Sequence, residues 1–251
     1  MVGDDDRVLR RKLATACRIL AQAGLVEDVL GHVSARVDDD GLLVRCRGPQ
    51  ERGLAYTTPD DIRLVSFDGG DPGGGYCVPN ELPIHVELLR ADPGVRAVVH
   101  AHPPVVIAAD LAGVPLLPLV GAYNIPAAKL AAAGIPVYPR GVLIRTPDLA
   151  AEMIAVMDGK PVCVLRGHGV TTTGTTVEQA VARALALDSL ARIATSVVAL
   201  GGTVRALPDD DLALLPDLGA AFNDELVWRH HEARLATAGL ALDDSIGGPD
   251  D

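Results

Sequence analysis

Two histidines separated by a single residue end an apolar segment of this chain. His100 and His102 flank Ala101, directly after the run 95–99. Successive side chains of a β-strand point to opposite faces, so both imidazoles are expected on the same face of one strand. Two such imidazoles repel each other if both are charged, and each needs a hydrogen-bond partner if it is buried. A divalent cation satisfies both nitrogens at once, so the pair favours a metal site over a structural role.

Two further residues extend this candidate site. His168 lies in the segment 166–170, just after another apolar run, and Glu81 lies at the start of an expected helix. Imidazole nitrogens together with a carboxylate suit Zn²⁺, Mn²⁺, Co²⁺ or Fe²⁺. These residue types therefore predict a metal site, provided that the fold brings them together.

The hydrophobic periodicity indicates the elements that must position these residues. Asp6 and Asn80 are expected to cap two of the helices. Strands are expected near 33–37, 42–46, 62–67, 95–102 and 162–165. Helices are expected near 6–23, 81–91, from 103 onward, and near 147–157, 176–200 and 216–238. Early hairpins followed by interspersed helices favour an antiparallel or mixed sheet covered by helices over strict βαβ alternation.

Length and composition are typical of one α/β domain. The chain has 251 residues, of which 49% are hydrophobic and 3% aromatic, so Ala, Val, Leu and Ile must build the core. We predict a single domain over 1–251, with disordered tails at about 1–5 and 243–251. A net charge of -11 argues against nucleic-acid binding. Four cysteines without CxxC spacing, and no targeting or membrane-spanning segment, lead us to expect a cytoplasmic protein that does not bind membranes.

Four segments in this order resemble the class II aldolase/adducin family. They are 31–36, Asn80-Glu81 followed by His85, 97–103, and 165–169, and the resemblance covers about 9–197. It implies a single-domain α/β/α fold with a central, mainly antiparallel sheet flanked by helices. It also implies a homotetramer with active sites between subunits.

The resemblance also assigns roles to the candidate residues. It implies that His100, His102 and His168 bind one divalent metal ion per subunit, Zn²⁺ or Mn²⁺, with Co²⁺ or Fe²⁺ as alternatives. Glu81 becomes the catalytic acid/base carboxylate, and its apolar neighbours are expected to raise its pKa towards the working range. His85 lies one helical turn after Glu81 and is a candidate to orient it, the alternative being a residue that packs under the site.

The chain departs from the sugar-phosphate members of this family where they hold the substrate phosphate. Those members have Gly-Asn where this chain has Gly31-His32, and Ser-Ser-Glu where it has Pro79-Asn80-Glu81. The segment 45–61 looks like an insertion that adds three arginines. Together these features resemble the branch that decarboxylates ortho-hydroxy aromatic dicarboxylates, such as the dihydroxyphthalate decarboxylases.

A small-molecule carboxylate substrate needs its own contacts. Arginine binds carboxylates in bidentate fashion, so Arg47 or Arg52 is a candidate, solvated hairpin arginines being the alternative. His32 is expected to hydrogen-bond a substrate hydroxyl or carboxylate, or else to bond to backbone. Tyr138 and Arg140 lie where family members send a residue into a neighbouring subunit's site. The predicted substrate-binding residues are His32, Ser34, Arg52, Asn80, Tyr138 and Arg140.

The leading functional hypothesis is a non-oxidative decarboxylase, a metal-dependent carbon–carbon lyase. The metal stabilises the charge left when CO₂ departs, and Glu81 delivers a proton. An aldolase acting on a non-phosphorylated hydroxy-keto acid or sugar uses the same chemistry and is the first alternative. An iron-dependent oxygenase of a hydroxyphenyl acid, and a non-catalytic adducin-like scaffold, remain as lower alternatives.

Overall fold

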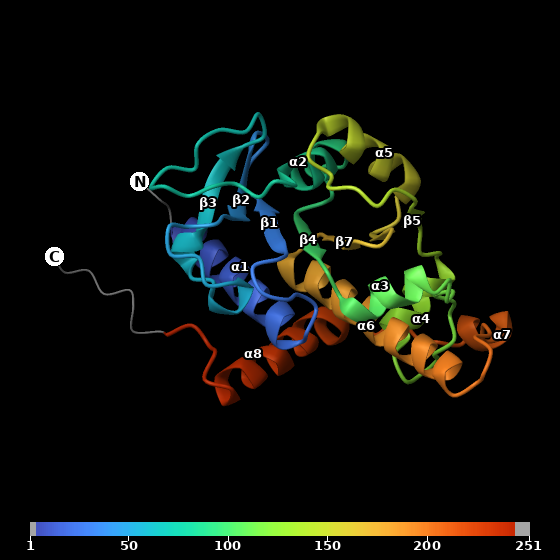
Figure 1. The fold of residues 1–251 in the computed structure, drawn as a ribbon. Coiled ribbons are helices and arrows are strands. Elements are labelled where there is room, and N and C mark those ends of the chain that lie inside the picture. Colours follow the sequence, from blue (N-terminus) through green and yellow to red (C-terminus); the bar gives the residue numbers. More distant parts are fainter. Residues whose placement is uncertain (1–3, 244–251) are drawn as a thin grey trace.

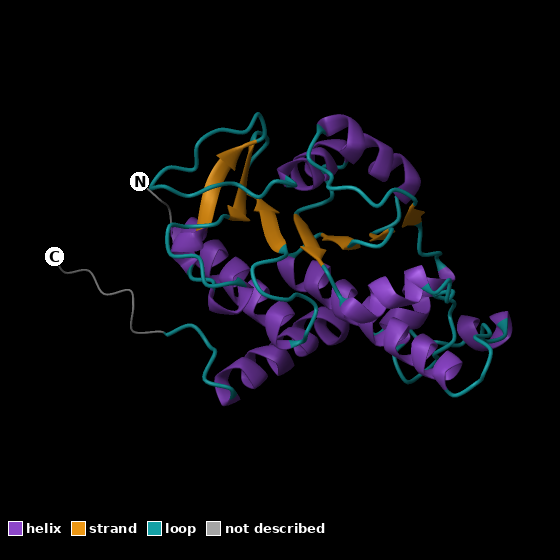
Figure 2. Ribbon diagram, in the orientation of Figure 1, coloured by secondary structure: helices purple, strands orange, loops and turns teal. Residues whose placement is uncertain are grey.

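The computed structural model describes residues 4–243 of the chain as a seven-stranded sheet between two layers of helices (Figures 1 and 2). The strands are β1 (His32–Arg36), β2 (Gly41–Arg45), β3 (Ile62–Ser66), β4 (Ala97–Ala101), β5 (Val137–Tyr138), β6 (Val162–Leu165) and β7 (Gly169–Gly174). The helices are α1 (Asp4–Gln22), α2 (Leu82–Ala91), α3 (Pro104–Leu111), α4 (Ile125–Ala132), α5 (Pro147–Met157), α6 (Val177–Ala199), α7 (Asp209–Ala213) and α8 (Val227–Thr237). This arrangement confirms the predicted α/β/α fold class.

The sheet is almost entirely antiparallel. Its strand order is β3-β2-β1-β4-β7-β6-β5, and β5 and β6 form its parallel pair. The predicted hairpins of the first three strands are therefore confirmed. Strand β7 was not predicted, although its three consecutive threonines, 171–173, are β-branched residues that favour strands. It pairs with β4 at the centre of the sheet, where Thr171 lies opposite His100 of the site described below.

Each face of the sheet has its own apolar core. Helices α2 and α5 cover one face, and α1, α3, α6 and α8 cover the other (Figure 1). Aliphatic side chains dominate both cores, as the composition predicts. Of the four cysteines, Cys17, Cys46 and Cys163 are buried among them and Cys77 is exposed.

Two element boundaries differ from the sequence-based expectation. Asn80 does not cap the helix that follows; Glu81 occupies the N-cap position of α2, and its side chain makes no capping hydrogen bond because the carboxylate is engaged elsewhere. Asp4 and Asp5, expected in a disordered tail, begin α1. The rest of the predicted tails lies outside the described residues, apart from Asp243, whose carbonyl accepts a hydrogen bond from Arg11. Within 4–243, no helix is both long and apolar enough to cross a bilayer.

Candidate metal centre

Four side chains from three separate parts of the chain converge at one end of the sheet. One ligand atom from each of Glu81, His100, His102 and His168 lies within 4.8 Å of the others. Glu81 Oε2 is 3.2 Å from His100 Nε2 and 3.4 Å from His168 Nε2. The Nε2 atoms of His100 and His102 are 2.8 Å apart. The sequence-predicted metal residues and the predicted catalytic carboxylate thus form a single cluster.

The central strand β4 positions two of the histidines. His100 pairs with His32 on β1 and with Thr171 on β7, so its ring is enclosed from both sides and is fully buried. His102 follows the end of β4, where its backbone N–H donates to the carbonyl of Leu25. Both rings lie on the same side of the strand, as the two-residue period predicts.

A tight turn between β6 and β7 presents the third histidine. The N–H of His168 donates to the carbonyl of Leu165 at 3.0 Å, and Gly167 adopts the left-handed conformation with φ +59°. A Cβ on Gly169 would lie 2.3 Å from the carbonyl oxygen of Ala101. Glycine at this position therefore lets β7 approach β4 closely enough for His168 to reach the other two histidines.

The carboxylate of Glu81 links the α2 layer to the histidines. Its Oε1 accepts a hydrogen bond from the backbone N–H of Ile144 at 2.9 Å, which leaves Oε2 facing His100 and His168. Burial acts to raise the pKa of Glu81, but hydrogen bonds and charge interactions with His100 and His168 outweigh it and hold the pKa well below its ordinary value. The expectation of a raised pKa is therefore wrong for this arrangement, and Glu81 is a carboxylate at neutral pH.

The chemistry of this cluster fits a divalent cation. Burial, together with the neighbouring His100 and His168, lowers the pKa of His102 to about 3, so this ring is neutral at neutral pH. Neutral imidazole nitrogens with a nearby carboxylate are the donors that Zn²⁺ and similar cations take. The three Nε2 atoms face one another. Their lone pairs repel unless a proton or a cation lies between them. His100, His102 and His168 can therefore hold the metal, with Glu81 beside it.

Comparison with known proteins shows which family this chain belongs to. A model of the class II aldolase and adducin N-terminal domain matches residues 11–195, well over half of the chain. The chain belongs to the class II aldolase/adducin family. Enzymes of this family use a divalent metal, in agreement with the histidine and carboxylate cluster.

Two curated relatives are similar to this class II aldolase family member along almost its whole length. The 3,4-dihydroxyphthalate decarboxylase of Arthrobacter keyseri is 55% identical over 234 residues, which covers 91% of this chain and 94% of that protein. The enzyme of the same name from Rhodococcus jostii is 53% identical over 230 residues, covering 90% and 95%. Both relatives are carboxy-lyases, so the predicted family branch and enzyme class are confirmed.

Solved structures agree on the fold. The class II aldolase family member superposes on an aldolase II superfamily protein from Pseudomonas syringae with a TM-score of 0.79, covering 96% of each chain at 24% identity. At this identity the likeness concerns the fold alone. The α/β/α architecture with its central sheet is therefore shared with that protein.

The ring of His85 contacts other residues in this family member than Glu81, the predicted partner. Its Nε2 lies 2.6 Å from Nδ1 of His32, and its Nδ1 lies 2.6 Å from Oγ of Ser34. Both ring nitrogens are thus occupied, and neither is hydrogen-bonded to Glu81 in the subunit. Ser34 is fully buried in this network, which leaves its hydroxyl with His85 rather than with a substrate. His32 stacks on His100 with ring centroids 4.9 Å apart and so adjoins the metal cluster.

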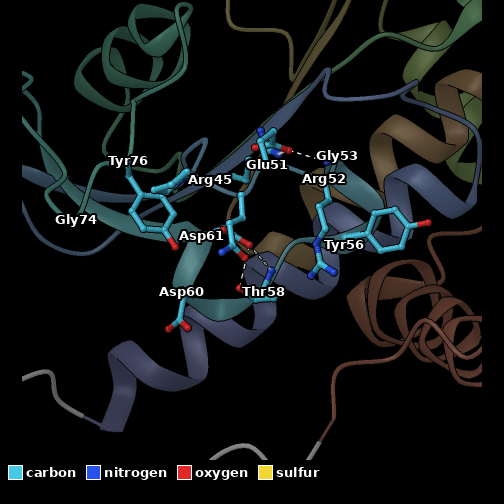
Figure 3. Close-up of a pocket in the computed structure, with 13 residues that line it drawn as sticks. Arg45, Glu51, Arg52, Gly53, Tyr56, Thr58, Asp60, Asp61, Gly74 and Tyr76 are labelled. Carbon is cyan, nitrogen blue, oxygen red and sulfur yellow. Dashed lines mark hydrogen bonds and ion pairs between the residues drawn. The ribbon is translucent and has the colours of Figure 1, made fainter.

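The remaining predicted substrate-binding residues are not among the four residues of the cluster. Arg52 is exposed, stacks on Tyr56 and lines a polar cavity of about 400 Å³ that includes none of the four cluster residues (Figure 3). The hydroxyl of Tyr138 donates to Glu152, which also pairs with Arg140. Asn80, Arg52 and Arg140 are all exposed, and Tyr138 is buried.

Three groups around the cluster were not foreseen from the sequence. The backbone N–H of Ile144 and the hydroxyl of Thr171 contact Glu81 and His100 respectively. Asp110 of α3 accepts hydrogen bonds from the turn that carries His168. Asp110 is the lone charged residue in the apolar helix 104–111, a signal that could have drawn attention to it. The other two contacts join residues more than 60 positions apart, and no local pattern announces them.

The buried histidines predict that the protein loses stability in mild acid. Burial, with a contribution from His100, lowers the pKa of His85 to about 3 from 6.5, so the unfolded chain binds a proton that the folded chain excludes. The contribution of His85 is therefore complete above about pH 6.5 and is lost as pH falls towards about 3. We expect His85→Gln to shrink the difference in unfolding free energy between about pH 7 and pH 5 by about 1–2 kcal/mol, measured by urea denaturation.

The exposed His230 provides the matched control for this measurement. His230→Gln makes the same change of residue type at the surface, so it measures the effect of the substitution apart from burial. Equal pH dependence in His85→Gln and in the unmodified protein would contradict the assignment of a neutral, buried His85.

Proposed function

We propose that this chain is a metal-dependent, non-oxidative decarboxylase of an ortho-hydroxy aromatic dicarboxylate, with 3,4-dihydroxyphthalate as the first substrate to test. The observation that carries the proposal is the convergence of three histidines and Glu81 in a chain that is 55% identical to a 3,4-dihydroxyphthalate decarboxylase over 91% of its length. The complete cluster also argues against a non-catalytic scaffold, for which a degraded set of histidines is expected.

The reaction places two demands on the site. Cleavage of the bond between the ring carbon and its carboxylate releases CO₂ and leaves an electron pair on the ring, which must then take up a proton. A divalent cation held by His100, His102 and His168 supplies Lewis-acid stabilisation of that negative charge. The other demand, delivery of the proton, falls to a residue beside the three histidines.

Glu81 is placed to move that proton. Its Oε2 faces His100 and His168, while the N–H of Ile144 fixes the orientation of the carboxylate through Oε1. In its ionised form Glu81 accepts a proton from the substrate hydroxyl or from water and passes it to the ring carbon. Glu81 and His100 are both buried, so the fold holds these two groups in place beside each other.

The surroundings of His32 support a substrate without a phosphate group. Sugar-phosphate members of the family have an asparagine at this position. This chain has an imidazole at this position, hydrogen-bonded to His85 and stacked on His100. The side-chain amide that could bind a phosphate is therefore missing. The metal is proposed to be Zn²⁺ or Mn²⁺ and the assembly a homotetramer, which elemental analysis and light scattering of the purified protein test directly.

The decisive experiment follows CO₂ release from 3,4-dihydroxyphthalate by the purified protein. We expect stoichiometric CO₂ and dihydroxybenzoate without consumption of O₂, and loss of activity after the metal is removed with a chelator. Phthalate, which lacks the hydroxyl groups, serves as the control and is expected to remain intact. No CO₂ from ortho-hydroxy dicarboxylates, together with cleavage of hydroxy-keto acids, would instead establish an aldolase.

A further inference from the structure

His168 differs from His100 in how its ring is held. The Nδ1 of His100 faces the hydroxyl of Thr171 at 3.4 Å. The Nδ1 of His168 is buried and has no hydrogen-bond partner among the residues that the structure describes. Metal-binding histidines are normally oriented by a hydrogen bond at the nitrogen that does not bind the metal. The orientation of His168 must therefore come from the backbone that carries it.

A buried carboxylate holds that backbone. Oδ1 of Asp110 accepts a hydrogen bond from Nε of Arg166 at 2.9 Å, and Oδ2 accepts one from the N–H of Gly167, also at 2.9 Å. The side chain of Asp110 is 6% exposed, whereas that of Arg166 is 49% exposed. Hydrogen bonds to an ionised, largely buried carboxylate are short and strong, so both oxygens tie the turn firmly to α3.

The position of α3 makes this contact relevant to the metal. The helix begins at Pro104, two residues after His102, so its backbone continues directly from the strand that carries His100 and His102. Asp110 at the far end of the same helix binds the two residues immediately before His168. One short helix therefore links the segment that supplies two ligands to the turn that supplies the third.

We propose that Asp110 is a positioning residue of the metal centre, which fixes the 166–168 turn and thereby the distance of His168 from His100 and His102. The proposal rests on the proposed function insofar as these histidines bind a metal. Asp110 hydrogen-bonds Arg166 and Gly167 and none of the histidine nitrogens of the cluster, so it acts through the turn. In this way Asp110 orients His168 in place of the hydrogen bond that is missing, among the described residues, at Nδ1 of that ring.

The variant Asp110→Asn tests this role because asparagine keeps the size of the side chain but offers one acceptor oxygen instead of two. We expect the dissociation constant for Zn²⁺, measured by calorimetric titration of the metal-free protein, to rise about 10- to 100-fold. The visible absorption of the Co²⁺-loaded protein is expected to change, because one histidine ligand is no longer held in place. The milder variant Arg166→Gln, which keeps the hydrogen bond to Gly167, is expected to weaken binding by a smaller factor.

Asp188→Asn is the matched control. Asp188 is a similarly buried carboxylate, 7% exposed, that accepts a hydrogen bond from Nε of Arg192 at 2.6 Å within α6. We expect this variant to lose some thermal stability and to keep its Zn²⁺ affinity within about twofold and its Co²⁺ spectrum unchanged.

The outcomes separate this proposal from the proposed function. Zn²⁺ affinity in Asp110→Asn within about twofold of the unmodified protein overturns the positioning role. If Asp110→Asn does not fold, the same result in Arg166→Gln overturns it. An unmodified protein that binds no Zn²⁺ also overturns it. A weakened Zn²⁺ affinity in Asp110→Asn, with no CO₂ released from dihydroxyphthalate by the unmodified protein, supports the role of Asp110 and rejects the proposed substrate.

Discussion

Replacing His100 with alanine is expected to abolish metal binding and to lower the turnover number for CO₂ release by about 1000-fold or more, equivalent to about 4 kcal/mol of transition-state stabilisation. The ring of His100 is fully buried, its Nε2 lies 2.8 Å from that of His102, and it also contacts Glu81. Its removal therefore takes away the central member of the cluster. Elemental analysis for metal content and a continuous CO₂ assay measure the two effects separately.

His231→Ala provides the matched control for this variant. His231 is a buried histidine on α8 and is not part of the metal cluster. Both substitutions leave a cavity where an imidazole was, so both are expected to lower stability. Retention of metal and turnover in His100→Ala, or equal loss of metal in His231→Ala, would falsify the assignment of the cluster as the metal centre.

Glu81→Gln is expected to separate metal binding from proton transfer. Glutamine still accepts the hydrogen bond from Ile144 but cannot take up and release a proton at the pH of the reaction. We expect the turnover number to fall by about 100- to 10,000-fold, the range over which a positioned acid/base group contributes. The metal affinity is expected to change by less than about tenfold, because the three histidines remain in place.

The measurement for Glu81→Gln combines turnover with the metal content of the same preparation. Glu178→Gln is the control. Glu178 lies on α6, pairs with Lys12 of α1 at 2.6 Å and has no contact with the cluster. It is expected to turn over substrate at the rate of the unmodified protein. A turnover number for Glu81→Gln within about tenfold of that protein would show that another group delivers the proton.

Much of this site could be predicted because its decisive signals are local. The spacing of His100 and His102 places both rings on one face of any strand, whatever surrounds it. Glu81 and His168 are far from that pair in sequence, and their roles came from the resemblance to a family rather than from spacing. The contacts made by His85 could not be predicted, because the helical spacing that brings it near Glu81 does not say which neighbour its nitrogens meet.

The arginines also show the difference between what residue type predicts and what only the fold decides. Arg52 was a reasonable candidate for a substrate carboxylate by residue type, but within the subunit it lines a cavity apart from the histidines (Figure 3). Arg166 lies only two residues before His168 and was not singled out, although its guanidinium is held by Asp110. Residue type indicates what a side chain can bind, and only the fold indicates what it is near.

By itself, the sequence determined the chemical groups of the site, the strand that presents two of them, and the α/β composition of the fold. These follow from local periodicity and residue chemistry, which act over a few residues. The tertiary structure decided that Glu81 is held ionised by His100 and His168, and that Asp110 holds the turn before His168. Such outcomes depend on distances between segments far apart in the chain, because desolvation and hydrogen bonding act between atoms that only the folded sheet brings together.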